Sequence, residues 1–318
     1  MIGYLIRRVL QAIVVLLGVL AIVTFLFWLE PPVTMAKAII GSRASPAQIK
    51  AVIAANGFGL PVWDQYWRLL DQYLHLDFGT SYTFNTPVRK LIAEYLPKTL
   101  LLVGMSTFLA LAVAIPLGVF QTVRRNKPSD YVLTSMAFFF YAVPVFVLGP
   151  VLILYLAVYH HIFLPVVPPD ESVKQLATNW QAMALPVFTL AAGTLAAFSR
   201  YMRSSMMDAL TNDYVRTAKA KGASSNRVLF RHAFRNALIP IITLVGLSIP
   251  AIVSGAVITE TVFSYPGMGY LTTRAATQLD LATVLGTTVV ATLATVVGSL
   301  LADILYAVAD PRIRYARK

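Results

Sequence analysis

Long apolar runs, each bounded by polar or charged positions, dominate the chain. A helix needs about 20 apolar residues to cross the hydrocarbon core of a bilayer. Six runs of suitable length predict membrane-spanning helices at residues 9–29, 99–123, 131–159, 184–202, 237–263 and 281–309. The pattern therefore predicts an all-α polytopic membrane protein with six transmembrane helices.

The first apolar run differs from a cleaved signal peptide. Signal peptides have an apolar region of roughly 7–15 residues followed by a small-residue cleavage site. This run is longer, follows Arg7 and Arg8, and ends in Trp28-Leu29-Glu30-Pro31-Pro32. We therefore expect residues 1–30 to form a retained first transmembrane helix.

A mixed polar and aromatic segment, residues 31–98, separates the first two predicted spans. Short helices are predicted at residues 46–55, 62–76 and 87–95, with a turn at Asp77-Phe78-Gly79-Thr80. The segment is expected outside the cytoplasm, either as a cap packed on the spans or as a docking surface for a soluble partner. Residues 99–309 would then form a five-helix core, and residues 310–318 a basic cytoplasmic tail.

Composition narrows the class of protein further. Apolar residues make up 58% of the chain and charged residues only 13%, about half the proportion that soluble domains carry. A water-soluble enzyme and a disordered chain are both disfavoured. The absence of cysteine excludes disulfides and thiol chemistry, and the four histidines form no H-x-x-x-H pair for a metal.

The positive charge is distributed unevenly between the predicted loops. The net charge is +12, and 17 of the 26 Lys and Arg residues fall in the N-terminus, the tail and the loops near residues 123–130 and 200–235. Cytoplasmic loops of membrane proteins carry such an excess. Both termini are therefore predicted to be cytoplasmic, and the charge needs no nucleic-acid partner.

The cytoplasmic loop at residues 203–236 carries a short helical pattern. Asn212 or Asp213 is placed to cap a helix, and Gly222 to end it. A second basic helix is predicted at residues 226–235. Two interpretations remain from the residues alone: a solvated loop that fixes topology, or a helix on the membrane surface that inserts into a cytoplasmic partner.

The same stretch carries a family resemblance. The ten residues are Asp213, Tyr214, Val215, Arg216, Thr217, Ala218, Lys219, Ala220, Lys221 and Gly222. Together with residues 77–81, 231–240, 258–269 and 303–314, they resemble the dipeptide/oligopeptide/nickel permeases of ATP-binding-cassette (ABC) importers, whose "EAA" loop they match. Arg216 stands where the general motif has Glu, and Arg235 where it has a proline. Both departures resemble the first permease of the peptide branch, although they remove any contact that needs a glutamate at 216.

The resemblance implies an assembly. It implies a type I ABC importer permease fold in a bacterial plasma membrane, a second homologous permease subunit, two cytoplasmic ATPase subunits and an extracytoplasmic substrate-binding protein. Residues 213–222 would be the coupling helix that one ATPase grips. The chain itself lacks the G-x-x-x-x-G-K-[ST] phosphate cradle. We therefore expect a non-catalytic subunit without a cofactor, and ATP with Mg on the partner ATPases.

Few ionisable residues interrupt the predicted spans, and such residues are functional candidates. Glu260 is either a structural partner of Arg274 or a contact for a cationic group in the translocation path. Pro250 and Ser254 are candidates for a gate, since proline bends helices and small residues permit close packing. Asp303 is expected to pair with a basic loop residue.

Three alternatives to a peptide importer remain at this stage. The first is a permease for nickel or another small solute, which the His160-His161 pair does not support because adjacent histidines on a helix cannot face one ion. The second is a stand-alone secondary transporter, which would need coupling residues near the midplane. The third is a membrane enzyme, for which no H-E-x-x-H motif is present.

Overall fold

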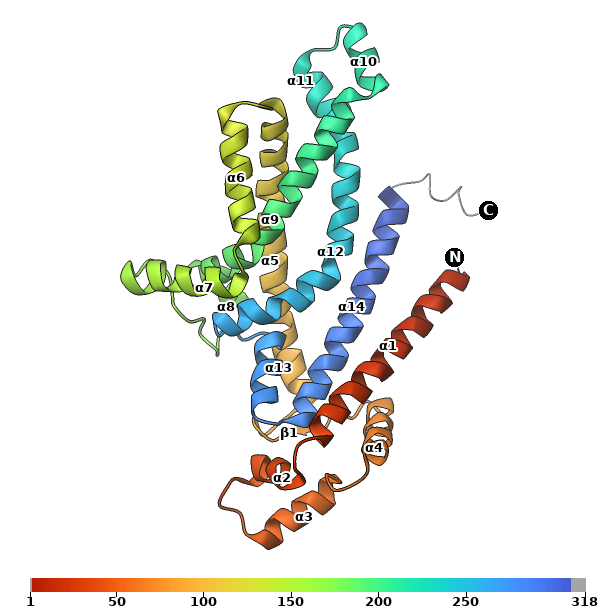
Figure 1. Ribbon diagram of the computed structural model, residues 1–318, viewed down its shortest axis with the longest axis vertical. Helices are drawn as coiled ribbons and strands as arrows, with labels where there is room; N and C mark the ends of the chain where they lie inside the picture. The colour runs from red at the N-terminus through yellow and green to blue at the C-terminus, as the bar shows by residue number, and fades with distance from the viewer. Residues whose placement is uncertain (1, 310–318) are drawn as a thin grey trace. The chain divides into compact units, whose positions relative to one another are not determined.

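A computed structural model describes the backbone of residues 2–309 and the side chains of residues 7, 10–242, 244–246 and 256–300. The chain is mainly helical (Figure 1). It divides into two compact units. The first unit comprises the chain up to Thr99 and Pro266–Val296, and the second comprises Leu100–Tyr265 and the chain from Val297 onward. Two long helices contribute residues to both units.

The first unit contains the N-terminal helices and one small hairpin. Its elements are α1 (Ile2–Trp28), α2 (Pro32–Ile40), α3 (Pro46–Asn56), α4 (Val62–Leu74), β1 (Thr80–Ser81), β2 (Thr86–Pro87), the first part of α5 (Val88–Val123), α13 (Met268–Thr277) and the first part of α14 (Leu281–Ala309). β1 and β2 are antiparallel, with Thr80 opposite Pro87. The helices predicted at 46–55 and 62–76 are confirmed, whereas 87–95 is the start of the long helix α5.

Local chemistry explains where these short elements begin and turn. Ser45 and Gln48 form a reciprocal capping box at the start of α3, which satisfies amides that the first helical turn leaves free. At the predicted turn, Gly79 adopts a φ of +71° and its amide donates to the Asp77 carboxylate. Only glycine takes that backbone conformation without steric cost.

Helix α4 is amphipathic, and its aromatic side chains divide between two faces. Tyr66 and Tyr73 pack with Leu20 of α1 and Leu285 of α14, and the Tyr66 hydroxyl donates to the carbonyl of Leu17. In contrast, Trp63 and Trp67 lie on the exposed face, with 68% and 63% of their surface accessible. Part of segment 31–98 therefore packs on spanning helices of the same unit.

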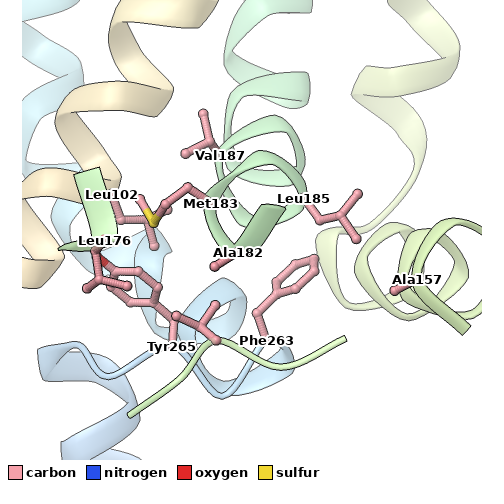
Figure 2. Packing of buried hydrophobic residues seen from close by; sticks show 10 residues of the cluster. Leu102, Ala157, Leu176, Ala182, Met183, Leu185, Val187, Phe263 and Tyr265 are labelled. Carbon is pink, nitrogen blue, oxygen red and sulfur yellow. The ribbon is translucent and has the colours of Figure 1, made fainter. Parts of the chain in front are cut away.

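The second unit holds the remaining helices. Its elements are the rest of α5, α6 (Pro128–Ala142), α7 (Val145–Leu152), the π-helix η1 (Ile153–Tyr159), α8 (Val173–Thr178), α9 (Trp180–Thr211), α10 (Asp213–Ala220), α11 (Ser225–Arg227), the π-helix η2 (Val228–Ala233), α12 (Phe234–Val262) and the end of α14. Figure 2 shows one core of this unit, where Met183 and Leu185 of α9 lie near Leu102, Phe263 and Tyr265. A second core gathers Met202, Met206 and Ile241 with small residues of α9 and α12.

Five described helices are long and apolar enough to cross a membrane, and a sixth crossing is possible through a bent pair. The bent pair corrects the single helix expected at residues 131–159, because α6 and the segment Val145–Tyr159 meet at 102°. Val143 is extended at the break, with a ψ of 121°, and Pro144 follows it. Proline disfavours helical backbone at the preceding residue, so the break lies where the sequence places it.

Candidate functional site

The candidate site is helix α10, which follows α9 after a single residue. Asn212 is extended, with a ψ of 152°, and occupies both the end of α9 and the N-cap position of α10. The sequence predicted that its side chain would cap α10, but it does not. The side-chain amide donates instead to the Asp208 carbonyl. The position of the cap was predicted correctly, but the hydrogen bond was not.

One face of α10 is buried against its own loop. Val215 is fully buried and Ala218 nearly so, and both pack with Val228 of η2. Leu210 and Ala223 lie beside this cluster and are partly buried. Burial of this apolar face fixes which side of the short helix remains available, since an isolated eight-residue helix is only marginally stable in water.

The rest of α10, with the two residues that end it, is exposed and carries three basic side chains and one acidic side chain. Its exposed residues are Asp213, Tyr214, Arg216, Thr217, Lys219, Ala220, Lys221 and Gly222. Acidic Asp213 in the first turn and basic Lys219 in the last complement the helix dipole. The Arg216–Asp213 pair is 3.7 Å apart and exposed to water, so it contributes little to stability.

Gly222 ends the helix, as the sequence predicted. Its φ is +77°, its amide donates to the Lys219 carbonyl, and the Ala223 amide donates to the Ala218 carbonyl. These two bonds form a Schellman motif, which satisfies free carbonyls at a helix end. The chain therefore reverses sharply after α10.

The return to the membrane differs from the sequence prediction. A second basic helix at 226–235 was expected, and these residues are helical, with α11, η2 and α12 following one another directly from Ser225 to Val262. Val228, Ala233 and Ala237 are buried along this segment. The helix is confirmed, but its end was not predicted, because the basic residues lie on a helix that continues into an apolar span.

The predicted path residues fall in or near α12. Pro250 and Ser254 lie in helical backbone, but their side chains are outside the described residues, as is that of Asp303. Glu260 is described and is fully buried. Close to it, burial raises the pKa of the Tyr265 phenol, and the Glu260 carboxylate raises it further. Arg274 lies over the Phe84 ring, at 5.2 Å from its centroid.

Asp130 and Arg203 form a partly buried ion pair that the sequence did not indicate. The two side chains come from α6 and α9 and meet at 2.8 Å. The only local signal is an acidic residue in the first turn of α6 beside the basic loop.

Two family profiles cover almost the whole chain. Residues 114–315 match the family described as "Binding-protein-dependent transport system inner membrane component", and residues 1–103 match its N-terminal companion. The chain belongs to this family. It is therefore a bacterial inner-membrane transport component with a permease fold.

Relatives of known name align along their full length. The oligopeptide transport system permease protein AppB of Bacillus subtilis (strain 168) is 40% identical over 99% of this chain and all of the relative. The oligopeptide transport system permease protein OppB of Haemophilus influenzae is 33% identical over the same shares. The family resemblance predicted from the loop motif is thereby confirmed.

A solved structure shares the fold of this permease family member. The inward-facing MetNI methionine ABC transporter aligns with a TM-score of 0.52 at 15% identity, covering 69% of this chain and 98% of that chain. At that identity the likeness concerns the fold alone. The predicted permease fold is confirmed.

Proposed function

We propose that this chain is the transmembrane permease subunit of an ATP-driven ABC importer and forms half of a translocation path for peptides. One observation carries the proposal: α10 presents an exposed, basic face directly beyond the end of the spanning helix α9, while Val215 and Ala218 anchor it from behind. Such a helix presents a binding surface to a separate protein.

The family supports a proposed assembly of several subunits. A binding-protein-dependent component needs a soluble protein that delivers cargo, and we propose that a second homologous permease completes the path. Two ATPase subunits, holding ATP and Mg, would bind the coupling helices. ATP hydrolysis can change the conformation of the permease only if the ATPases bind α10 with different affinities in two permease conformations. A binding partner shifts a conformational equilibrium only through such a difference in affinity.

Peptide is the favoured cargo because the aligned relatives are named for oligopeptide transport. Their full-length alignment extends this likeness to both family segments. The proposed topology places both termini and residues 203–236 in the cytoplasm. It places residues 31–98 outside, with the core at 99–309 and the basic tail at 310–318.

Purification of the tagged protein from its native membrane tests the proposal. Mass spectrometry should find a second permease, ATPases with phosphate-binding loops and a binding protein. Peptide uptake into proteoliposomes of this complex should require internal ATP. Uptake by this chain alone without ATP would overturn the proposal in favour of a secondary transporter.

A matched pair of variants tests the coupling helix itself. Ala220→Trp places a bulky side chain on the exposed face of α10, and we expect the ATPase subunits to be lost from the purified complex. Asn226→Trp changes an equally exposed residue of the same loop outside α10 and should retain them. Equal retention by both variants would contradict the assignment of α10.

A further inference from the structure

A partly buried ion pair connects two helices of the second unit close to the coupling loop. The Asp130 Oδ2 atom of α6 accepts from Nη2 of Arg203 on α9 at 2.8 Å. The Asp130 side chain is 3% exposed and that of Arg203 is 27% exposed. The pair is therefore shielded from solvent at its acidic end, where Coulombic attraction is stronger than at a surface.

The α5–α6 loop is attached to the same carboxylate. The backbone amide of Asn126 donates to Asp130 Oδ2 at 3.1 Å, with Asn126 at a φ of +62° in the tight turn before α6. On the other side, the Thr122 hydroxyl of α5 donates to the Arg203 carbonyl at 3.2 Å. One cluster thus joins the ends of α5 and α6 to a single turn of α9.

Stability alone does not account for this arrangement. Apolar replacement of a buried ion pair is often neutral or stabilising, so such a pair is weak evidence for a stabilising role. The pair does fix the relative orientation of the two side chains, because the planar guanidinium of arginine binds a carboxylate in a fixed geometry. A directional contact between two helices is suited to setting their relative position.

The cluster lies near the coupling helix along the chain. Arg203 is in the last part of α9, which continues as regular helix to Thr211, and α10 begins at Asp213 after Asn212. A force on α10 therefore reaches Arg203 through the extended residue Asn212 and the continuous last part of α9. Met206 and Ala209 pack in the apolar core of the same helical segment.

We propose that the Asp130–Arg203 pair is a positioning contact that transmits movement of the coupling helix from α9 to α6. This inference rests on the proposed function of α10. Arg203 moves with α9, and Asp130 carries the movement to α6 and to the α5–α6 loop. Loss of the pair uncouples α6 from the ATPases, while α10 still binds them.

The test uses the complete importer, with its binding protein, in lipid nanodiscs and proteoliposomes. Asp130→Asn retains an oxygen that accepts the Asn126 amide but removes the charge. Arg203→Gln removes the other partner, and the double variant removes both. Arg200→Gln is the control, because this arginine lies one turn away on α9 and stacks on the Tyr141 ring instead of pairing with a carboxylate.

We expect basal ATP hydrolysis and subunit composition to be retained in all variants. Stimulation of hydrolysis by peptide-loaded binding protein, and peptide uptake, should fall about fivefold or more in the single variants of the pair. The double variant should be no worse than Asp130→Asn, since coupled residues are not additive. Arg200→Gln should remain close to the wild type.

Several results would overturn the positioning role. One is unchanged stimulation of ATP hydrolysis in Asp130→Asn, and another is a loss of stimulation in the double variant equal to the sum of the single losses. A third is an equal fall of basal and stimulated hydrolysis, which would indicate a structural effect only. If Asp130→Asn assembles poorly, Arg203→Lys tests the positioning role instead, because it keeps the charge but loses the planar geometry. Full stimulation of hydrolysis in Arg203→Lys overturns the proposal. A wild-type complex without ATP-driven uptake would instead refute the proposed function.

Discussion

The Asp280 carboxylate is a buried acceptor at the start of α14. It accepts from the amide and hydroxyl of Thr283 at 3.2 and 2.9 Å, from the Thr83 amide at 3.4 Å and from the Ser81 hydroxyl. The side chain thereby caps α14 and attaches the β1–β2 hairpin to it. Several donors depend on one residue, so its removal leaves buried polar groups without a partner.

We predict that Asp280→Ala lowers the free energy of unfolding by about 2–3 kcal/mol, which is the scale for stranding buried donors. Asp280→Asn should cost less because it keeps an acceptor oxygen. Thermal unfolding of the purified protein measures both effects. Asp64→Ala, at an exposed position in the first turn of α4, serves as the control. Equal melting temperatures for Asp280→Ala and the wild type would refute the prediction.

Two tyrosines of the first unit are expected to lower the free energy of unfolding at alkaline pH. Burial raises the pKa of the Tyr73 phenol, with a smaller contribution from Asp77. Burial and then Asp280 raise the pKa of Tyr82. A raised pKa means that the folded state keeps its proton when the unfolded chain, with a pKa near 10, has lost it. This stability is complete below about pH 10 and is lost as the pH rises through the folded-state pKa.

Tyr73→Phe separates this effect from other alkaline titrations. The Tyr73 hydroxyl is buried and has no hydrogen-bond partner among the described atoms. Its removal should therefore not destabilise the protein at pH 8, because no hydrogen bond is lost, and should flatten the loss of stability between pH 9 and 11. Melting temperatures across that range check the prediction. A steeper loss in the variant would contradict the assigned cause.

At the scale of elements, α5 and α9 approach each other closely at Gly118. A Cβ atom added there would meet the Met202 Cβ at 2.6 Å and the Ser199 carbonyl oxygen at 2.8 Å. One of these atoms is backbone, so the contact cannot be relieved by a side-chain rotation alone. The same helix carries Gly104, where a Cβ would meet nothing within 4 Å.

This pair of glycines provides an internal comparison on one helix. Gly118→Ala should destabilise the protein by about 1–3 kcal/mol through overpacking. Gly104→Ala should be neutral or stabilise by up to about 1 kcal/mol, since alanine favours helix more than glycine. Melting temperatures of the two variants in the same detergent decide the matter. Similar values for both would show that α5 and α9 are not packed tightly at Gly118.

The elements also show how far local pattern predicts structure. Helix α10 and its end at Gly222 were predictable because cap and stop residues act within a few positions. Pro144 indicates a bend in this span, but its size of 102° was not predictable, because apolar residues on both sides of Pro144 continue the same hydropathy signal. The Asp130–Arg203 contact joins positions 73 residues apart. No periodicity along the chain encodes such a pairing.

At the scale of the whole molecule, the distribution of charge predicts how the chain is threaded through the membrane. Lys and Arg gather in loops 123–130 and 200–235, whereas the short loops on the opposite side hold only Lys174 and Arg274. The positive-inside rule then predicts that α10 lies in the cytoplasm. This topology is required for the proposed function, because ATP and the ATPases are cytoplasmic.

The chain lacks cysteine, so single cysteines can report this topology without background. We predict that Lys50→Cys, exposed in α3, reacts with a membrane-impermeant maleimide on intact cells, whereas Asn226→Cys, exposed in the coupling loop, reacts only after permeabilisation. Mass spectrometry of the purified variants quantifies the label, and a permeant maleimide controls for reactivity of each thiol. The reverse pattern would invert the topology. It would place α10 where no ATPase reaches it, and the coupling proposal would fail with it.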